Sequence, residues 1–115
     1  MTFLDKRVLI VDDDKNLLNL LTLILQKKGY IVDGAETGKE ALERIRQQSY
    51  QAALIDIVLP DVNGLDLLEY ISPQTKKIIL TGSNSEENRK KASTEGASAF
   101  LIKPLRIEKI LEIIN

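Results

Sequence analysis

Cysteine and histidine are both absent from this sequence of 115 residues. Without them the chain cannot form a disulfide, use a thiol or an imidazole in catalysis, or offer the sulfur and nitrogen ligands that zinc prefers. Any metal ion bound here must therefore be a hard cation held by oxygen atoms. Long apolar runs are missing too, and none approaches the roughly 20 residues of a membrane-spanning helix. The sequence therefore predicts no contact with the membrane interior.

Neither sign of charge is in excess, because 16 basic residues face 17 acidic ones and the net charge is −1. This balance gives no indication of direct nucleic-acid binding or of an anionic membrane surface as a partner. A hydrophobic content of 43% and a length of 115 residues suit one soluble domain, 1–115. The N-terminal segment MTFLDKR is too short and too soon charged for a signal peptide, so we expect a cytoplasmic protein.

Short apolar runs alternate along the chain with segments of helical pattern. Such alternation predicts an α/β fold, in which helices cover both faces of a parallel sheet through right-handed crossovers. The second run is followed at once by Asp33, so we expect that strand at an edge of the sheet. The five runs predicted as strands are 8–11, 30–32, 52–55, 78–80 and 99–102.

The helical segments differ in the apolar surface that they offer. In the first, the spacing of Leu17, Leu20, Leu21 and Ile24 predicts one buried stripe. The helix after Gly64 should be short, ending near 72–73, and the helix over 85–95 has Ala92 as its only apolar residue. We therefore expect the 85–95 helix to be loosely held. The remaining predicted helices have apolar positions at Ala41, Leu42 and Ile45, after a Thr37 and Glu40 capping box, and at Ile107, Ile110, Leu111 and Ile114.

Polar residues follow the strands at the sheet edge where open parallel sheets bind ligands. They are Asp12 and Asp13, Asp56, Thr81 and Lys103. Singly, each has an ordinary explanation: Asp13 or Asp14 could cap a helix, Thr81 could belong to a turn, and Lys103 could be a surface lysine. Together, crowded carboxylates favour Mg²⁺, while a lysine and a hydroxyl suit the oxygens of a phosphoryl group. An aspartate in such a place can itself be the nucleophile that forms an acyl phosphate.

Four motifs resemble those of the receiver domain of two-component response regulators, the CheY-like family. They stand as VLIVDDD (8–14), LIDIVLPDVNG (54–64), IILTG (78–82) and FLIKP (100–104), and the resemblance covers essentially the whole chain. It implies a flavodoxin-like (βα)5 fold, a doubly wound parallel sheet with the strand order 2-1-3-4-5. It also implies a signalling switch that catalyses its own phosphorylation and dephosphorylation, rather than a conventional enzyme.

The resemblance further implies roles for single residues. Asp56 would accept a phosphoryl group from a histidine kinase or phosphotransfer protein, and Lys103 and Thr81 would contact its oxygens. Mg²⁺ would be bound by Asp12, Asp13, Asp56 and the backbone carbonyl of Val58. Thr81 and Phe100 would act as the switch, changing the surface formed by 85–95, 99–102 and the last helix. A downstream effector, a fused output domain or a second copy in a phosphorylated homodimer would read that surface. The Lys103–Pro104 peptide bond is often cis in this family.

Some positions depart from the usual family pattern or leave the interpretation open. Phe100 stands where a tyrosine is commoner and could be an ordinary core residue, and Ala99 disfavours one dimer mode of DNA-binding regulators. Val58 and Ser83 lack the amide or acidic groups that would position a water, which predicts slow self-dephosphorylation. Lys90, Lys91, Arg106 and Lys109 make the output surface mildly basic or are ordinary solvated residues.

Two other functions compete with the phosphorylated switch. A receiver fold can serve as a phosphorylation-independent interaction module, although such modules usually lose one of the site residues and this chain retains them all. A flavodoxin-like cofactor binder fits less well, because three carboxylates stand after the first strand where a phosphate-cradling loop would be needed.

Overall fold

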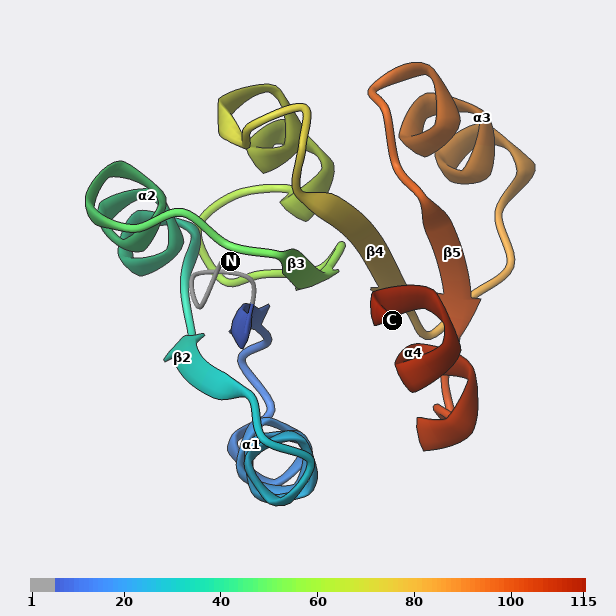
Figure 1. The fold of residues 1–115 in the computed structure, drawn as a ribbon. Helices are drawn as coiled ribbons and strands as arrows, with labels where there is room; N and C mark the ends of the chain where they lie inside the picture. Colours follow the sequence, from blue (N-terminus) through green and yellow to red (C-terminus); the bar gives the residue numbers. More distant parts are fainter. Residues whose placement is uncertain (1–5) are drawn as a thin grey trace.

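The computed structural model describes residues 6–115. The prediction of no signal peptide concerns 1–7, and 1–5 of that segment lie outside the described residues. Five parallel strands form one sheet in the order β2-β1-β3-β4-β5, which confirms the predicted flavodoxin-like topology (Figure 1). The strands are β1 (Arg7–Val11), β2 (Ile31–Ala35), β3 (Ala52–Asp56), β4 (Lys76–Thr81) and β5 (Ala99–Ile102).

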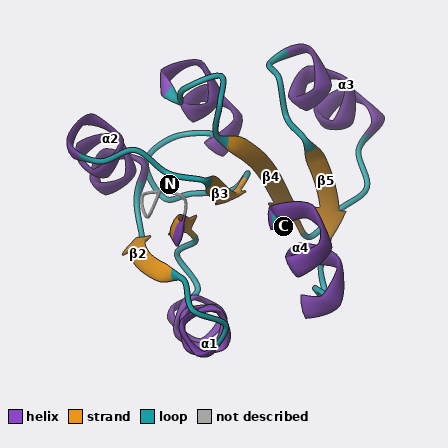
Figure 2. Cartoon of the chain, viewed as in Figure 1, coloured by secondary structure: helices purple, strands orange, loops and turns teal. Residues whose placement is uncertain are grey.

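Helices cover both faces of this sheet, as the alternating pattern predicts (Figure 2). The first face carries α1 (Lys15–Lys27) and α4 (Ile107–Ile114), and the second carries α2 (Gly38–Gln47), the 3₁₀-helix η2 (Gly64–Tyr70) and α3 (Glu86–Thr94). Side chains of a strand alternate between the faces, so in β1 Val8 and Ile10 pack under α1 and α4, while Leu9 and Val11 pack on the other side. The central strands are therefore buried on both sides, which explains their unbroken apolar runs.

The edge position predicted for β2 is confirmed, but this strand is longer than the pattern suggested. It continues through Asp33 and Gly34 to Ala35. The charge of Asp33 is tolerated within the strand because its carboxylate accepts hydrogen bonds from the Tyr50 hydroxyl, at 2.7 Å, and from Arg7, at 3.4 Å. A charged residue thus marks the edge of this sheet without ending the strand.

The stripe predicted for the first helix is wrong in part. The residues that α1 buries are Leu18, Leu21 and Leu25, whereas Leu20 is 54% exposed and Leu17 and Ile24 are half-buried. The cause is that α1 has apolar residues on more than one side, so two different sets of residues have helical spacing. Which set is buried depends on the position of the sheet. The stripes predicted for α2 and α4 do face the core, with Ala41, Ile110 and Ile114 fully buried.

The helix after Gly64 is short, as predicted, and α3 has the single buried apolar residue that the sequence indicated. η2 is a single 3₁₀ segment, which buries Leu65, Leu67 and Leu68 before the chain turns at 72–75. α3 buries Ala92 alone, so little apolar contact holds it to the sheet. Within the described part of the chain, no helix has both the length and the apolar character to cross a membrane.

Candidate functional site

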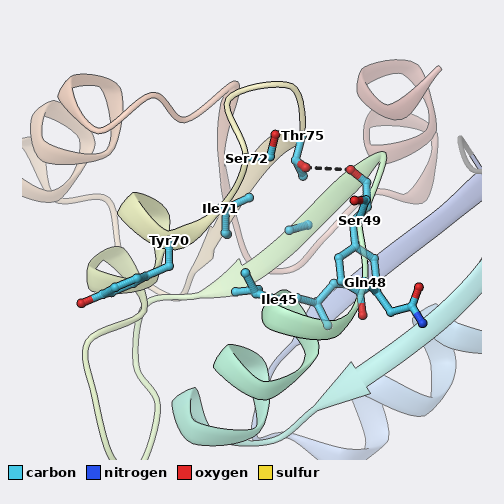
Figure 3. Close-up of a pocket in the computed structure, with 10 residues that line it drawn as sticks. Ile45, Gln48, Ser49, Tyr70, Ile71, Ser72 and Thr75 are labelled. Atoms are coloured by element: carbon cyan, nitrogen blue, oxygen red, sulfur yellow. Dashed lines mark hydrogen bonds between the residues drawn. The ribbon is translucent and has the colours of Figure 1, made fainter.

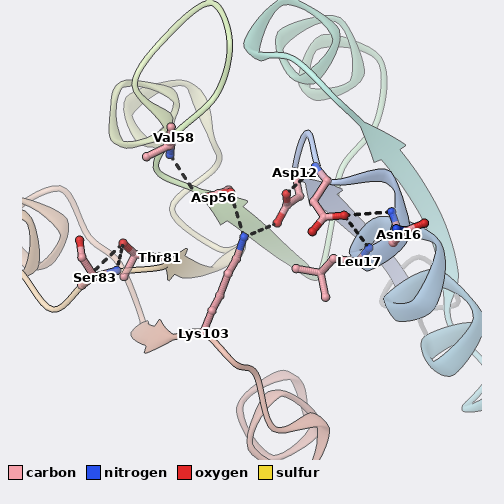
Figure 4. A network of polar contacts seen from close by, with 9 residues as sticks. Asp12, Asn16, Leu17, Asp56, Val58, Thr81, Ser83 and Lys103 are labelled. Carbon is pink, nitrogen blue, oxygen red and sulfur yellow. Dashed lines mark hydrogen bonds and ion pairs between the residues drawn. The ribbon is translucent and has the colours of Figure 1, made fainter.

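The predicted polar residues meet at the carboxyl ends of the parallel strands, which together form one edge of the sheet. Lys103, which follows β5, lies between two acidic residues, with its Nζ 3.1 Å from Asp12 Oδ2 and 3.0 Å from Asp56 Oδ2 (Figure 4). Asp13 belongs to the same group, since one carboxylate oxygen from each of Asp12, Asp13 and Asp56 lies within 4.8 Å of the others. The order of the strands explains this convergence, because β1 and β3 are neighbours and β5 lies two places beyond β3.

Asp14 is the acidic residue that caps the first helix. Its Oδ1 accepts hydrogen bonds from the backbone N–H groups of Asn16, at 3.0 Å, and Leu17, at 3.2 Å. These N–H groups have no partner inside the helix, and a carboxylate next to them is also favoured by the helix dipole. The three consecutive aspartates therefore differ in role: Asp14 caps α1, and Asp12 and Asp13 belong to the acidic cluster.

Asp12 is fully buried, and its charge is only partly compensated. Its Oδ1 accepts a hydrogen bond from the backbone N–H of Asp14, at 2.9 Å, and its Oδ2 accepts one from Lys103. Burial raises the pKa of Asp12 above its usual value, and the charge of Asp56 adds to this effect, while the two hydrogen bonds oppose it. A second positive charge at the cluster would therefore be stabilising.

Lys103 supplies a positive charge to the acidic cluster. Burial by itself would lower its pKa, but the hydrogen bonds and charges of Asp56 and Asp12 outweigh burial and leave the pKa above its ordinary value. Lys103 therefore stays protonated at neutral pH. One ammonium group faces three carboxylates, so the cluster retains an excess of negative charge.

Asp56 ends β3 and is only 6% exposed. Its Oδ1 accepts a hydrogen bond from the backbone N–H of Val58, at 3.2 Å, so the loop that follows begins by folding back on the carboxylate. Gly64 closes this loop against the same residue: a Cβ at that position would lie 1.9 Å from the Asp56 carbonyl oxygen. Only glycine fits there, which explains its place at the end of the LIDIVLPDVNG motif.

Thr81 ends β4 at the same edge, but its hydroxyl is turned away from the acidic cluster. The hydroxyl donates to the Ser83 carbonyl, at 3.2 Å, and accepts from the Ser83 N–H, also at 3.2 Å (Figure 4). In the described part of the chain no hydrogen bond joins it to Asp56 or Lys103. The structure thus brings Asp12, Asp13, Asp56 and Lys103 together and places Thr81 beside them with its side chain occupied elsewhere.

Phe100 is half-buried in β5 and packs against the core below α2, η2 and α3. The guanidinium of Arg89, from α3, lies over its ring at 4.5 Å from the centroid, and Arg89 also donates to Asn84, at 3.1 Å. Sequence reasoning missed Arg89, since nothing in a polar helix indicates which basic residue will cover an aromatic ring. The Lys103–Pro104 bond is cis, as the family resemblance implied.

The donor set of the acidic cluster fits a hard divalent cation. Carboxylate oxygens on three residues, close together and short of positive charge, are the ligands that Mg²⁺ and Ca²⁺ prefer. Val58 lies next to the cluster, where its N–H contacts Asp56 and its side chain is 71% exposed (Figure 4). The cluster could therefore bind a metal ion.

A separate hollow lies at the other end of the strands, where β3 and β4 begin. It has a volume of about 280 Å³ and is lined by residues near the beginnings of β3 and β4, among them Ser49, Tyr50, Ser72 and Thr75 (Figure 3). Thr75 donates its hydroxyl hydrogen to the Tyr50 carbonyl, at 2.7 Å, which joins the two segments. No acidic residue lines this hollow, so we place the chemistry at the acidic cluster.

Comparison with known proteins agrees with this geometry. The sequence model of the response regulator receiver domain matches residues 8–115. Response regulator ArlR of Staphylococcus saprophyticus is 36% identical over 111 residues, a match that covers 95% of this chain and 50% of that protein. The chain thus spans about half the length of this relative.

Solved structures are similar over almost the whole chain. A CheY-like receiver domain protein from Methanospirillum hungatei has 42% identity and a TM-score of 0.91, covering 96% of this chain and 90% of that one. A response regulator from Burkholderia pseudomallei, solved with a phosphorylated aspartic acid, a calcium ion and citrate, has 29% identity and a TM-score of 0.90, covering 96% of this chain and 67% of that one. With its strand order, its acidic edge and these matches, the chain belongs to the response regulator receiver domain family, whose members act in two-component signalling.

Proposed function

We propose that this domain is a switch that is activated by phosphorylation of Asp56. The observation that carries the proposal is the lysine shared by two buried carboxylates at the carboxyl edge of the sheet, with a third carboxylate within 4.8 Å. The receiver domain family and a neighbour solved with a phosphorylated aspartic acid support the same assignment. The phosphoryl donor would be a histidine kinase or a phosphotransfer protein.

The chemistry is the transfer of a phosphoryl group from a phosphohistidine to a carboxylate. An oxygen of Asp56 forms a bond to phosphorus while the bond from phosphorus to the donor imidazole nitrogen breaks, and the electron pair of that bond stays with the imidazole. Bound at Asp12, Asp13, Asp56 and the Val58 carbonyl, Mg²⁺ would offset negative charge during the transfer. Lys103, held protonated beside Asp56, is placed to contact a phosphoryl oxygen.

Thr81 and Phe100 would carry the change to the surface. The Thr81 hydroxyl now bonds only with Ser83 among the described hydrogen bonds, and these two long contacts leave it free to turn toward an arriving phosphoryl group. Phe100 lies on β5, the strand paired with β4, so movement at the end of β4 is transmitted to its surroundings. The surface of α3, β5 and α4 would then be read by an effector, an output domain or a second copy.

The donor protein would dock beside Lys103. There the half-buried Leu17 and the exposed Leu20 of α1 meet Leu105 and Ile107 in a groove of about 320 Å³ that extends to Lys103 and Pro104. A helical donor that carries a phosphohistidine could cover this apolar groove and reach Asp56 at the same time. This location, like the cytoplasmic setting in which histidine kinases act, is part of the proposal.

Hydrolysis of the acyl phosphate would be slow. Val58 and Ser83 flank the site, and both are exposed, but neither side chain carries an amide or an acid that could position an attacking water. We expect the phosphorylated protein to persist for minutes or longer, which is measured by following its decay over time. A lifetime of seconds would contradict this part of the proposal.

The test of the main proposal is intact mass after incubation with acetyl phosphate, with and without Mg²⁺. Wild type should gain one phosphoryl group only with Mg²⁺, and Asp56→Asn, which keeps the size and removes the nucleophile, should gain none. No gain in wild type under either condition would favour the phosphorylation-independent interaction module.

A further inference from the structure

Asp61 joins the loop after Asp56 to a distant helix. Its Oδ1 accepts a hydrogen bond from the Gly38 N–H, at 2.8 Å, and its Oδ2 accepts one from the Lys39 N–H, at 3.0 Å. These are the first two residues of α2, and both N–H groups lack a partner within the helix. The side-chain hydroxyl of Thr37, the N-cap of the same helix, accepts from the Glu40 N–H, at 3.1 Å. The start of α2 is therefore capped jointly by its own threonine and by an aspartate 22 or 23 residues further along the chain.

The contact is close as well as polar. A Cβ at Gly38 would lie 2.3 Å from a methyl carbon of Val62 and 3.3 Å from Asp61 Oδ1, so the loop tip is seated directly on the first turn of α2. The helix terminus favours a negative charge there, and the hydrogen bond from Gly38, followed by that from Lys39, holds the pKa of Asp61 below its usual value. Asp61 is thus ionised and bound at neutral pH.

The other end of the same loop is fixed at the acidic cluster. The Gly64 N–H donates to the Ile57 carbonyl, at 2.7 Å, and Val58 and Asn63 form an antiparallel bridge across the loop. Val58 lies between the two anchors, and its N–H contacts the Asp56 carboxylate. The position of the Val58 peptide group therefore depends on the base of the loop, at Asp56 and Gly64, and on its tip, at Asp61.

We infer that Asp61 is a positioning residue for the phosphorylation site. It holds the loop 57–63 against α2 and so keeps Val58, whose N–H contacts the Asp56 carboxylate, in the position from which its carbonyl would bind a metal ion. This inference rests on the proposed function in one respect, the use of the Val58 carbonyl as a ligand. Residues that orient metal ligands without touching the metal affect metal affinity strongly.

The experiment compares Asp61→Ala with Thr37→Ala. Both variants remove side-chain hydrogen bonds from the start of α2, but only Asp61 belongs to the loop, so Thr37→Ala controls for a plain loss of helix capping. Mg²⁺ binding is measured by titration of backbone amide NMR signals, and exchange of the Val58 amide hydrogen is measured without metal.

Asp61→Ala should weaken Mg²⁺ binding by about tenfold and speed exchange of the Val58 amide. Asp61→Asn, which keeps one acceptor but no charge, should fall between this variant and wild type, and it serves as the test variant if Asp61→Ala does not fold. Thr37→Ala should lower Tm while leaving both readouts close to wild type.

Two results would overturn the positioning role: Mg²⁺ affinity within twofold of wild type in Asp61→Ala and Asp61→Asn, or an equal loss in Thr37→Ala. A wild type that binds no Mg²⁺ would instead contradict the proposed metal site, and with it the part of this inference that concerns the metal. In that case unchanged exchange of the Val58 amide in the Asp61 variants would also refute the role of Asp61 in holding the loop.

Discussion

Lys103→Met should turn the partly compensated acidic cluster into one that depends on a metal ion for stability. In wild type the ammonium group lies 3.1 Å from Asp12 and 3.0 Å from Asp56, and the side chains of these two aspartates are 0% and 9% exposed. Methionine keeps most of the length of the side chain but carries no charge. Without the ammonium, two buried carboxylates repel each other and have lost a hydrogen-bond donor.

The size of the effect follows from the burial of the partners. Removing one member of a fully buried ion pair costs about 3–5 kcal/mol. The Lys103 side chain is 26% exposed, and water reaches this edge of the sheet, so we expect a smaller loss of about 2–3 kcal/mol. For a domain of this size that loss lowers Tm by roughly 10 °C. Mg²⁺ should return most of this stability, because a ligand at 100 times its Kd contributes about 2.7 kcal/mol.

The assay is thermal unfolding followed by circular dichroism, in EDTA and over a range of Mg²⁺ concentrations. The rise in Tm with Mg²⁺ should be larger in Lys103→Met than in wild type, since the metal no longer competes with the ammonium for the same oxygens. Lys76→Met is the matched control, because the Lys76 ammonium donates to the carbonyls of Ile113, at 2.8 Å, and Ile114, at 3.3 Å, and pairs with no carboxylate among residues 6–115. It should lose stability without a change in its response to Mg²⁺.

Unfolding of Lys103→Met in EDTA within about 2 °C of wild type, which is the scale of an ordinary surface substitution, would refute this role of the ammonium group. An equal rise in the Tm of both proteins with Mg²⁺ would refute the competition between the metal and Lys103.

Two further predictions concern contacts outside the cluster. Arg89→Met should cost about 0.5–1 kcal/mol and shift the NMR signals of the Phe100 ring, because the cation over the ring is lost; ring shifts no larger than those in Lys90→Met would contradict the stacking. The lowered pKa of Asp61 means that its contribution to stability is complete above the unfolded pKa, near 3.8, and is lost as pH falls through the still lower folded pKa. The Tm of wild type should therefore fall more steeply than that of Asp61→Asn as the pH is lowered from about 5 to 3, and parallel curves would contradict this.

The convergence of the acidic residues could be predicted from sequence because it depends on topology alone. Once short apolar runs are recognised as parallel strands, their carboxyl ends must meet at one edge, and the residues that follow them must meet there too. Asp12 and Asp56 behave in this way because they follow or end buried strands, and Lys103 because it directly follows β5, a half-buried strand of the same sheet. The same reasoning could not select the cap of α1, because Asp13 and Asp14 are chemically equivalent until backbone geometry distinguishes them.

Other features could not be predicted because they depend on contacts between segments. The residues that α1 buries are determined by the direction from which the sheet approaches a helix that is apolar on more than one side, and periodicity does not contain this direction. Asp61 follows a proline and resembles any acidic turn residue, and its partners at Gly38 and Lys39 lie in a different repeat of the fold. Arg89 and Phe100 meet only because α3 crosses over β5.

These contacts indicate how a site that is phosphorylated as we propose would also be stable. A buried Asp12 with a raised pKa is costly to the fold, and the cost is limited by a lysine that is itself held protonated by the acids. The same lysine must leave part of this arrangement if a phosphoryl oxygen is to take its place beside Asp56. Under the proposed function, the stability of the domain and the reactivity of Asp56 would therefore depend on the same ammonium group, and a substitution at Lys103 should change both together. Asp61 acts at the other end of the loop, where it can change the geometry of Val58 while the ion pairs of Lys103 remain intact.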